Sequence, residues 1–102
     1  MGYVYLLCDP NQEYYKIGVT RGSIQNRIKK LQTGNGTHIH IVSYYKTEYP
    51  FKLEKLLHTK FAPKRVLNEW FDLDVNDITQ FLSICESTEK DLIYLIENNP
   101  FM

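Results

Sequence analysis

The sequence predicts an α+β domain built on a small antiparallel sheet, and three observations lead to this prediction. Two β-rich runs flank a short polar stretch near the N-terminus, helical periodicity follows the second and the third β-rich run, and two apolar helical stripes come last. With 102 residues, of which 43% are hydrophobic, the chain is long enough for one core and too short for two. We therefore expect one domain over residues 1–102.

The first element is a β-hairpin. The runs "YVYLLC" (3–8) and "YYKIGV" (14–19) are rich in aromatic and aliphatic residues, as strands are. Between them, "DPNQE" (9–13) supplies the Pro and Asn that are typical of turns.

A helix and a third strand follow the hairpin. Ser23 can cap a helix that runs to about Thr33, and Gly34 is placed to end it. The stretch "HIHIVSYYK" (38–46) alternates in polarity and is rich in β-branched and aromatic residues, which predicts the third strand.

A second helix is predicted from about residue 51 to 61, since Pro50 stands near its start and leucines recur at helical spacing. We expect "APKRVLN" (62–68) to form a loop, and "EWFDL" (69–73) is compatible with a short edge strand.

Two closing helices are expected within residues 74–98. Asp74 is a suitable N-cap for the first of them, and Ser87 or Thr88 for the second. The complete order, ββαβα followed by two helices, is that of an α+β domain.

Charge and cysteine content limit the class of protein. Twelve basic residues balance twelve acidic ones, so any contact with nucleic acid must be local. Cys8 and Cys85 lie in apolar segments without zinc-site spacing, which favours free thiols in a reducing cytosol over a disulfide. No signal-peptide pattern opens the sequence and no apolar run approaches the roughly 20 residues that span a bilayer, so we expect a cytoplasmic protein without membrane contact.

One cation interrupts the apolar face of the first predicted helix. Ile24, Ile28 and Leu31 follow the spacing of a buried stripe, and the remaining position of that stripe is Arg27. Its guanidinium either extends to water at the edge of the stripe or points into a polar pocket beside the core.

Alternation along the hairpin places Tyr5 on one face of the first strand, and Lys16 and Gly18 together on one face of the second. If the aliphatic residues between them fill the opposite face, Tyr5 and Lys16 share a face. A glycine inside a strand usually marks a bulge or a close approach by a backbone or a ligand, so we expect something near Gly18. A half-buried packing role for the tyrosine is the alternative.

Glu54 and His58 are i, i+4 neighbours on the second helix and are either a plain surface pair or part of a site. Together with Tyr5, Lys16 and Arg27 they would suit a phosphodiester. Cations can neutralise a phosphate, a carboxylate can hold Mg²⁺, and Tyr or His can move protons to and from a water.

The order and spacing of these motifs resemble the GIY-YIG endonuclease superfamily. "YVY" at 3–5 and "KIG" at 16–18 are followed by Arg27 and then by Glu54 in a later helix. The longer pattern "YVYLL … YYKIGVT … R … L … E … LH … F … R … EWF" is similar to the short phage- and virus-borne branch, in which KIG replaces YIG. The resemblance covers about residues 2–73. It implies a nuclease that depends on Mg²⁺ or Mn²⁺ and acts on DNA, with a three-stranded antiparallel sheet flanked by helices.

The resemblance also implies roles for single residues. Tyr5 matches the first tyrosine of the family, Arg27 its arginine and Glu54 its metal-binding glutamate. Lys16 stands where the second tyrosine usually lies, and we expect it to contact phosphate as a cation. Tyr15 is next to it, but one step along a strand turns a side chain to the opposite face.

Further residues complete the expected site. We expect Gly18 to let substrate approach, Arg65 to contact substrate, and His58 to act as a reserve base. Glu69 of "NEWF" either faces the site or only precedes two aromatic residues that close the core.

The predicted reaction is hydrolysis of a DNA phosphodiester by water. Tyr5, with its phenolate favoured by Lys16 and Arg27, or a metal-bound hydroxide would accept the proton of the water, while Glu54 holds the metal. The alternatives are a noncatalytic nucleic-acid-binding module and a small viral interaction protein with the same fold. Because the net charge is zero, we expect a homodimer or a separate DNA-targeting partner to supply affinity.

Overall fold

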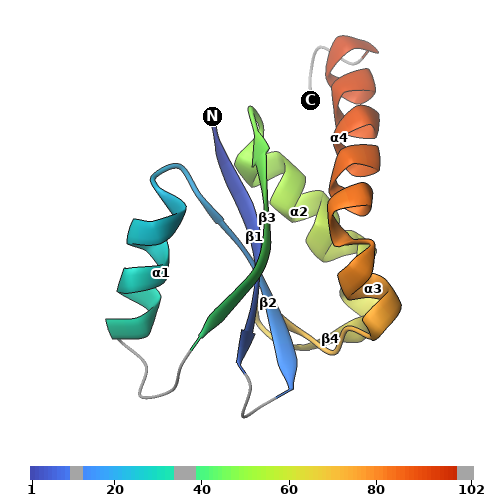
Figure 1. The fold of residues 1–102 in the computed structure, drawn as a ribbon. Helices are drawn as coiled ribbons and strands as arrows, with labels where there is room; N and C mark the ends of the chain where they lie inside the picture. Colours follow the sequence, from blue (N-terminus) through green and yellow to red (C-terminus); the bar gives the residue numbers. More distant parts are fainter. Residues whose placement is uncertain (10–12, 34–38, 99–102) are drawn as a thin grey trace.

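The protein, described by a computed structural model, has its elements placed over residues 1–9, 13–33 and 39–98 (Figure 1). In chain order they are β1 Gly2–Asp9, β2 Tyr14–Thr20, α1 Ile24–Thr33, β3 His40–Thr47, α2 Pro50–Lys60, a 3₁₀ turn Ala62–Lys64, β4 Arg65–Leu67, β5 Trp70–Phe71, α3 Val75–Thr79 and α4 Phe81–Asn98.

The sheet is antiparallel and has five strands in the order β3-β1-β2-β5-β4. The three predicted strands form its contiguous half β3-β1-β2. In the β1–β2 register Tyr5 lies opposite Gly18 and Leu7 opposite Lys16. Directly opposed residues project from the same face, so the predicted shared face of Tyr5 and Lys16 is confirmed.

The prediction of a three-stranded sheet was wrong in number, because the β4–β5 hairpin adds two strands beyond β2. β4 has three residues, all exposed, and lies in the segment that was expected to be a loop. So short and exposed a strand has no measurable periodicity, and its pairing depends on tertiary contact with β5.

Helices cover both faces of the sheet (Figure 1). α1 packs on the face of Tyr5 and Leu7, against which its residues Ile24 and Leu31 lie. α2 and α4 pack on the opposite face, where the larger core is formed by Val4, Leu6, Ile17, Leu53, Leu57, Phe61, Phe71, Leu73, Phe81, Cys85 and Leu92. The two faces meet at the outer edge of β2, beyond the short stretch that β5 covers.

Ser23 and Asp74, each proposed as the N-cap of its helix, both cap that helix in the structure. The Asn26 N–H donates to Ser23 Oγ at 3.3 Å at the start of α1. At α3, Asp74 and Asp77 form a reciprocal capping box. The expected end of α1 at Gly34 lies outside the described residues.

The N-cap proposed at Ser87 or Thr88 was wrong, because α4 already begins at Phe81 and runs through both positions. Phe81, Cys85, Thr88 and Leu92 form one continuous buried stripe on that helix. Burial of this stripe outweighs the local preference of Ser and Thr for caps.

Two further sequence expectations bear on the chain as a whole. Cys8 and Cys85 are free thiols, and Cys85 is buried. Within residues 1–9, 13–33 and 39–98, no helix has both the length and the apolar character that crossing a bilayer demands.

Candidate functional site

Three potential metal ligands converge at the outer edge of β2. One ligand atom from each of Glu54, His58 and Glu69 lies within 4.8 Å of the others, and all three residues are half-buried. Glu54 and His58 are one turn apart on α2, whereas Glu69 belongs to the turn between β4 and β5. The N–H of Ile17 on β2 donates to the Glu69 carbonyl at 3.1 Å, which holds this turn against the strand edge.

Glu54 carries the most informative atom of the group. Its Oε2 is buried and has no hydrogen-bond partner among the described residues. Burial, and then the nearby charge of Glu69, raises the pKa of the Glu54 carboxyl above its usual value. A buried carboxylate oxygen without a donor is costly, and a divalent cation with carboxylate ligands would satisfy it. The residues present therefore fit a Mg²⁺ or Mn²⁺ ion.

His58 is held in one orientation by two contacts. Its Nε2 lies 2.9 Å from the Ile17 carbonyl oxygen, and its ring packs edge-to-face on Phe71 with 5.1 Å between centroids. A carbonyl only accepts, so we assign the hydrogen to Nε2, which leaves Nδ1 of the neutral ring with a lone pair. Nδ1 is the nitrogen that can accept a proton or bind a metal.

Two cations border the carboxylates. Lys16 Nζ lies 3.4 Å from Glu69 Oε2, and the lysine side chain is 17% exposed. On the α1 side, the Arg27 Nε–H donates to the Tyr5 hydroxyl at 3.1 Å. Of the two alternatives for Arg27, the structure favours the polar contact beside the core, because the partly exposed side chain donates to Tyr5 on the sheet.

Tyr5 is 2% exposed and stays protonated. Burial raises the pKa of its hydroxyl, and the hydrogen bond from Arg27 only partly opposes this effect. Arg27 thus favours the phenolate, as expected, but burial has the larger effect on the pKa and the phenolate is not favoured overall. Because the hydroxyl oxygen accepts from Arg27, the O–H of Tyr5 is left to donate in another direction.

Gly18 makes room for the Tyr5 ring. A β-carbon at position 18 would lie 2.4 Å from both Cζ and the hydroxyl oxygen of Tyr5. Glycine is thus needed because the ring lies directly over the backbone of β2. The close neighbour of Gly18 is therefore a side chain of the adjacent strand, whereas the sequence led us to expect a backbone or a substrate there.

Of the remaining candidates, one joins the cluster and two lie on the opposite face of the sheet. Glu69, which the sequence left ambiguous, joins the cluster with Glu54 and His58. Arg65 lies on exposed β4 opposite Phe71, on the face away from Lys16, and no contact with the cluster is found for it within the described part of the chain. Tyr15 packs against the larger core on that same opposite face, as predicted.

The signal for Glu69 was present in "NEWF" but weak. Asn68 has φ of 52°, a left-handed conformation that asparagine tolerates in tight turns. A turn at Asn68 and Glu69 closes a hairpin between β4 and β5, but only pairing of β5 with β2 brings Glu69 to the helix.

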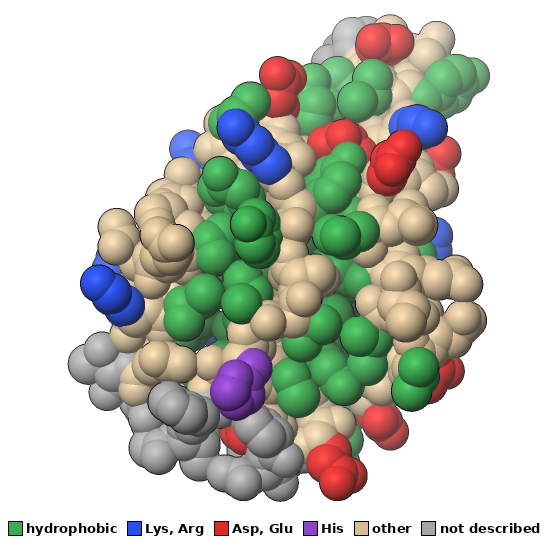
Figure 2. All heavy atoms as spheres, in the orientation of Figure 1, with side chains coloured by type: hydrophobic (Ala, Val, Ile, Leu, Met, Phe, Trp, Pro, Cys, Tyr) green, Lys and Arg blue, Asp and Glu red, His purple; other side chains and the backbone are tan. Residues whose placement is uncertain are grey.

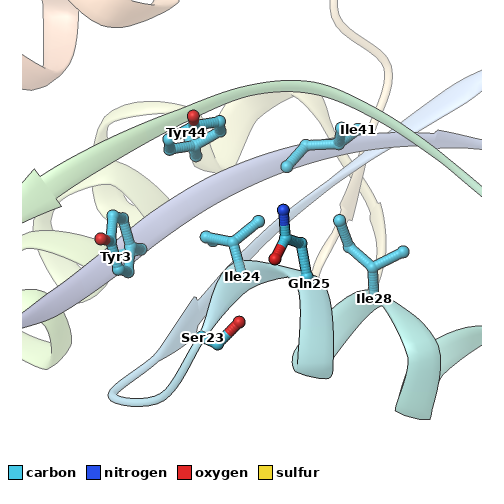
Figure 3. Close-up of a pocket in the computed structure, with 7 residues that line it drawn as sticks. All are labelled: Tyr3, Ser23, Ile24, Gln25, Ile28, Ile41 and Tyr44. Atoms are coloured by element: carbon cyan, nitrogen blue, oxygen red, sulfur yellow. The ribbon is translucent and has the colours of Figure 1, made fainter.

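A separate hollow of about 370 Å³ lies between α1 and the strands β1 and β3 (Figure 3). It is lined by Tyr3, Ser23, Ile24, Gln25, Ile28, Ile41 and Tyr44. Figure 2 has the same orientation as Figure 1, and hydrophobic side chains are gathered over the middle of the face that it shows. The residues that line the hollow include none of the predicted site residues.

Comparison with known proteins gives one match. The family model of the T5orf172 domain matches residues 2–86, which include the whole sheet, α2 and every residue of the cluster. Neither the curated proteins nor the solved structures contain a match to the chain.

Proposed function

The chain belongs to the T5orf172 domain family, a phage-associated domain related to nuclease-like folds, and on this premise we propose a metal-dependent endonuclease of GIY-YIG type. Its reaction would be hydrolysis of phosphodiester bonds in DNA. One observation carries the proposal: a buried oxygen of Glu54, which has no hydrogen-bond partner in the described part of the chain, lies in a carboxylate and histidine cluster that two cations border.

Glu54 and Glu69 are the residues that would hold Mg²⁺ or Mn²⁺, since these ions prefer oxygen ligands. When bound, the ion would offset negative charge on the scissile phosphate and the leaving oxygen. Lys16 is paired with Glu69 and would reduce the charge repulsion between the two carboxylates.

Arg27 would bind the nonbridging phosphate oxygens. Tyr5 accepts from Nε, so the terminal nitrogens of the guanidinium remain able to donate to an anion. This hydrogen bond also orients the guanidinium before substrate arrives, which is how preorganised donors stabilise a transition state.

His58, rather than Tyr5, would accept the proton of the attacking water. The raised pKa of the Tyr5 hydroxyl makes it a poor base, whereas the free Nδ1 of His58 can accept a proton. Tyr5 would instead donate its O–H to a substrate oxygen.

Tight recognition of a DNA target would need more surface charge than this chain carries. The twelve basic and twelve acidic residues cancel. A homodimer or a separate DNA-targeting partner would supply the additional contacts.

The test is a cleavage assay on plasmid and branched DNA with Mg²⁺, Mn²⁺ or EDTA. We expect metal-dependent cleavage by wild type, a loss of at least about 100-fold in Glu54→Gln, and unchanged cleavage in Glu97→Gln. Glu97 is an exposed glutamate on α4 and provides the matched control. In parallel, Mn²⁺ should raise the melting temperature of wild type but not of Glu54→Gln.

Other results would contradict the proposal. DNA binding without metal-dependent cleavage would favour the noncatalytic binding module. The absence of any DNA affinity at low salt would favour an interaction protein.

A further inference from the structure

An apolar ledge continues the row of residues to which Lys16 belongs. In the sheet register Lys16 of β2 lies opposite Trp70 of β5, and Trp70 lies opposite Leu67 of β4. Directly opposed residues share a face, so the three side chains lie side by side. Adjacent strands are about 5 Å apart, which places Trp70 one strand and Leu67 two strands from the lysine.

The two apolar members of this row are not explained by packing. Among the described residues, neither core cluster includes Trp70 or Leu67, although Phe71 beside them is fully buried in one. Leu67 is 65% exposed and Trp70 is partly exposed. Other apolar residues of the described chain are equally exposed, and what sets this pair apart is its place in the same row as Lys16.

The hairpin that carries the ledge is anchored at both ends. At its tip the Ile17 N–H donates to the Glu69 carbonyl, and at its base the Asp72 N–H donates to the Lys64 carbonyl at 2.8 Å. The Lys64 side chain also pairs with Asp77 of α3. The position of the ledge relative to the Glu69 carboxylate is therefore set before any ligand binds.

We propose that Trp70 and Leu67 form a stacking platform for an unpaired nucleobase of the DNA strand whose phosphate lies at Lys16. This inference rests on the proposed function and on the expectation from the sequence that Lys16 contacts a phosphate. An aromatic face next to a cation suits a single nucleotide, because the base stacks on the ring while the cation neutralises the phosphate. Glu69 Oε2 lies 3.4 Å from Lys16 Nζ, so a phosphate at the lysine would also adjoin the carboxylate and histidine cluster.

Trp70 is the only tryptophan in the chain, so its emission reports on the platform directly. The experiment titrates the protein in EDTA and low salt with a short oligothymidylate, and with an abasic oligonucleotide of the same length and charge. We expect the base-bearing strand to quench Trp70 emission and to bind about tenfold more tightly, which is about 1.4 kcal/mol. The abasic strand should bind through its phosphates with little quenching.

Variants are compared by the anisotropy of labelled oligonucleotides, which does not depend on Trp70. Trp70→Ala should reduce the affinity ratio of the two strands to near one, and Trp70→Phe should keep most of it. Leu67→Ala, at an exposed position that should not affect folding, should lower the ratio about threefold. Val75→Ala is the control, since Val75 is a 76% exposed aliphatic residue on α3.

Equal quenching by both strands, or a ratio that Leu67→Ala and Trp70→Ala leave unchanged, would overturn the platform. A ratio that is lost only in Tyr44→Ala would also overturn it, and would place the base in the hollow beside α1 (Figure 3). The readout needs no cleavage. A chain that never cuts but shows base-dependent quenching would retain the platform and lose only the nuclease proposal.

Discussion

Single side chains in the site are held in states that they would not keep in water. Glu54 has a raised pKa and a buried oxygen to which none of the residues placed by the structure donates, and Tyr5 is buried with its hydroxyl accepting from Arg27. Such perturbed groups are concentrated at functional sites, although structural networks also produce them. The informative substitutions are therefore those that distinguish a role in the reaction from a role in stability.

Arg27→Ala should lower the cleavage rate by at least about 100-fold, roughly 3 kcal/mol of transition-state stabilisation. The free energy of unfolding should fall by about 1 kcal/mol or less, since Tyr5 loses one donor. Single-turnover cleavage and urea unfolding measure the two effects. Lys30→Ala, at an exposed position on the same helix, is the control. Normal cleavage by an unstable Arg27→Ala protein would make the arginine structural.

Lys16→Arg should retain measurable cleavage, because a cation can still pair with Glu69 and meet a phosphate. Lys16→Met should lose most of the activity, and Lys16→Tyr, which creates the YIG motif of the GIY-YIG superfamily that the sequence resembles, should not exceed wild type. Single-turnover rates for the three proteins test this order. If the methionine protein cleaves as wild type does, Lys16 is a solvated strand residue without a role in the reaction.

Gly18→Ala should destabilise the protein by about 1–3 kcal/mol, because the new methyl group would overlap the Tyr5 ring. In a Tyr5→Leu background the same change should cost clearly less, since the ring is gone. Urea unfolding of the four proteins of this cycle gives the coupling free energy. An equal cost in both backgrounds would show that Gly18 is required for another reason.

At the level of elements, a polar contact fixes α4 on the sheet. The carboxylate of Glu89 in α4 accepts from the Tyr45 hydroxyl at 2.8 Å and from the Thr47 hydroxyl, both on β3. Burial, together with the carboxylate, raises the pKa of Tyr45 well above its usual value, so its hydroxyl remains a donor at neutral pH. The last helix is thereby attached to the strand at the far edge of the sheet from the β4–β5 hairpin.

Tyr45→Phe should lower the free energy of unfolding by about 1–2 kcal/mol, because it removes a hydrogen bond to a charged acceptor. Tyr44 is the preceding residue on the same strand and its side chain is 54% exposed, so Tyr44→Phe should change the free energy of unfolding by less than about 0.5 kcal/mol. Urea unfolding of both proteins is the measurement. Equal losses would mean that the contact with Glu89 contributes no more than a surface hydroxyl.

For the whole molecule, charge balance bears on how the proposed DNA substrate would be bound. With a net charge of zero, association would depend on the few cations near the site rather than on a broad basic surface. The site itself joins both sides of the sheet, since Arg27 comes from the α1 side and Glu54 from the α2 side.

The isolated chain should bind duplex DNA with a dissociation constant of roughly 10⁻⁴–10⁻⁶ M at physiological salt, and binding should weaken steeply as salt rises. Titration of fluorescent duplex at two salt concentrations measures both quantities. Nanomolar, sequence-specific binding by the monomer would contradict this expectation.

Local pattern was sufficient for much of this protein. Alternation in "YVYLL" and "YYKIGVT" showed that Tyr5 shares a face with Lys16, and helical spacing placed Glu54 one turn from His58. Asp74 was identified as a cap from its residue type and position. Each of these facts concerns one element or one hairpin, where backbone geometry alone determines which side chains are neighbours.

The tertiary structure decided what joins those elements. Pairing of β5 with β2 extends the sheet to five strands and brings Glu69 to Glu54. Strands of three and two residues are too short to show a periodicity from which this pairing could be predicted. Packing of α1 buries Tyr5, and this burial keeps the tyrosine protonated. The place of the Tyr5 ring over β2 explains why residue 18 is a glycine. Such distances and burial depend on how separate elements pack, and the periodicity of one element contains no information about its distance from another.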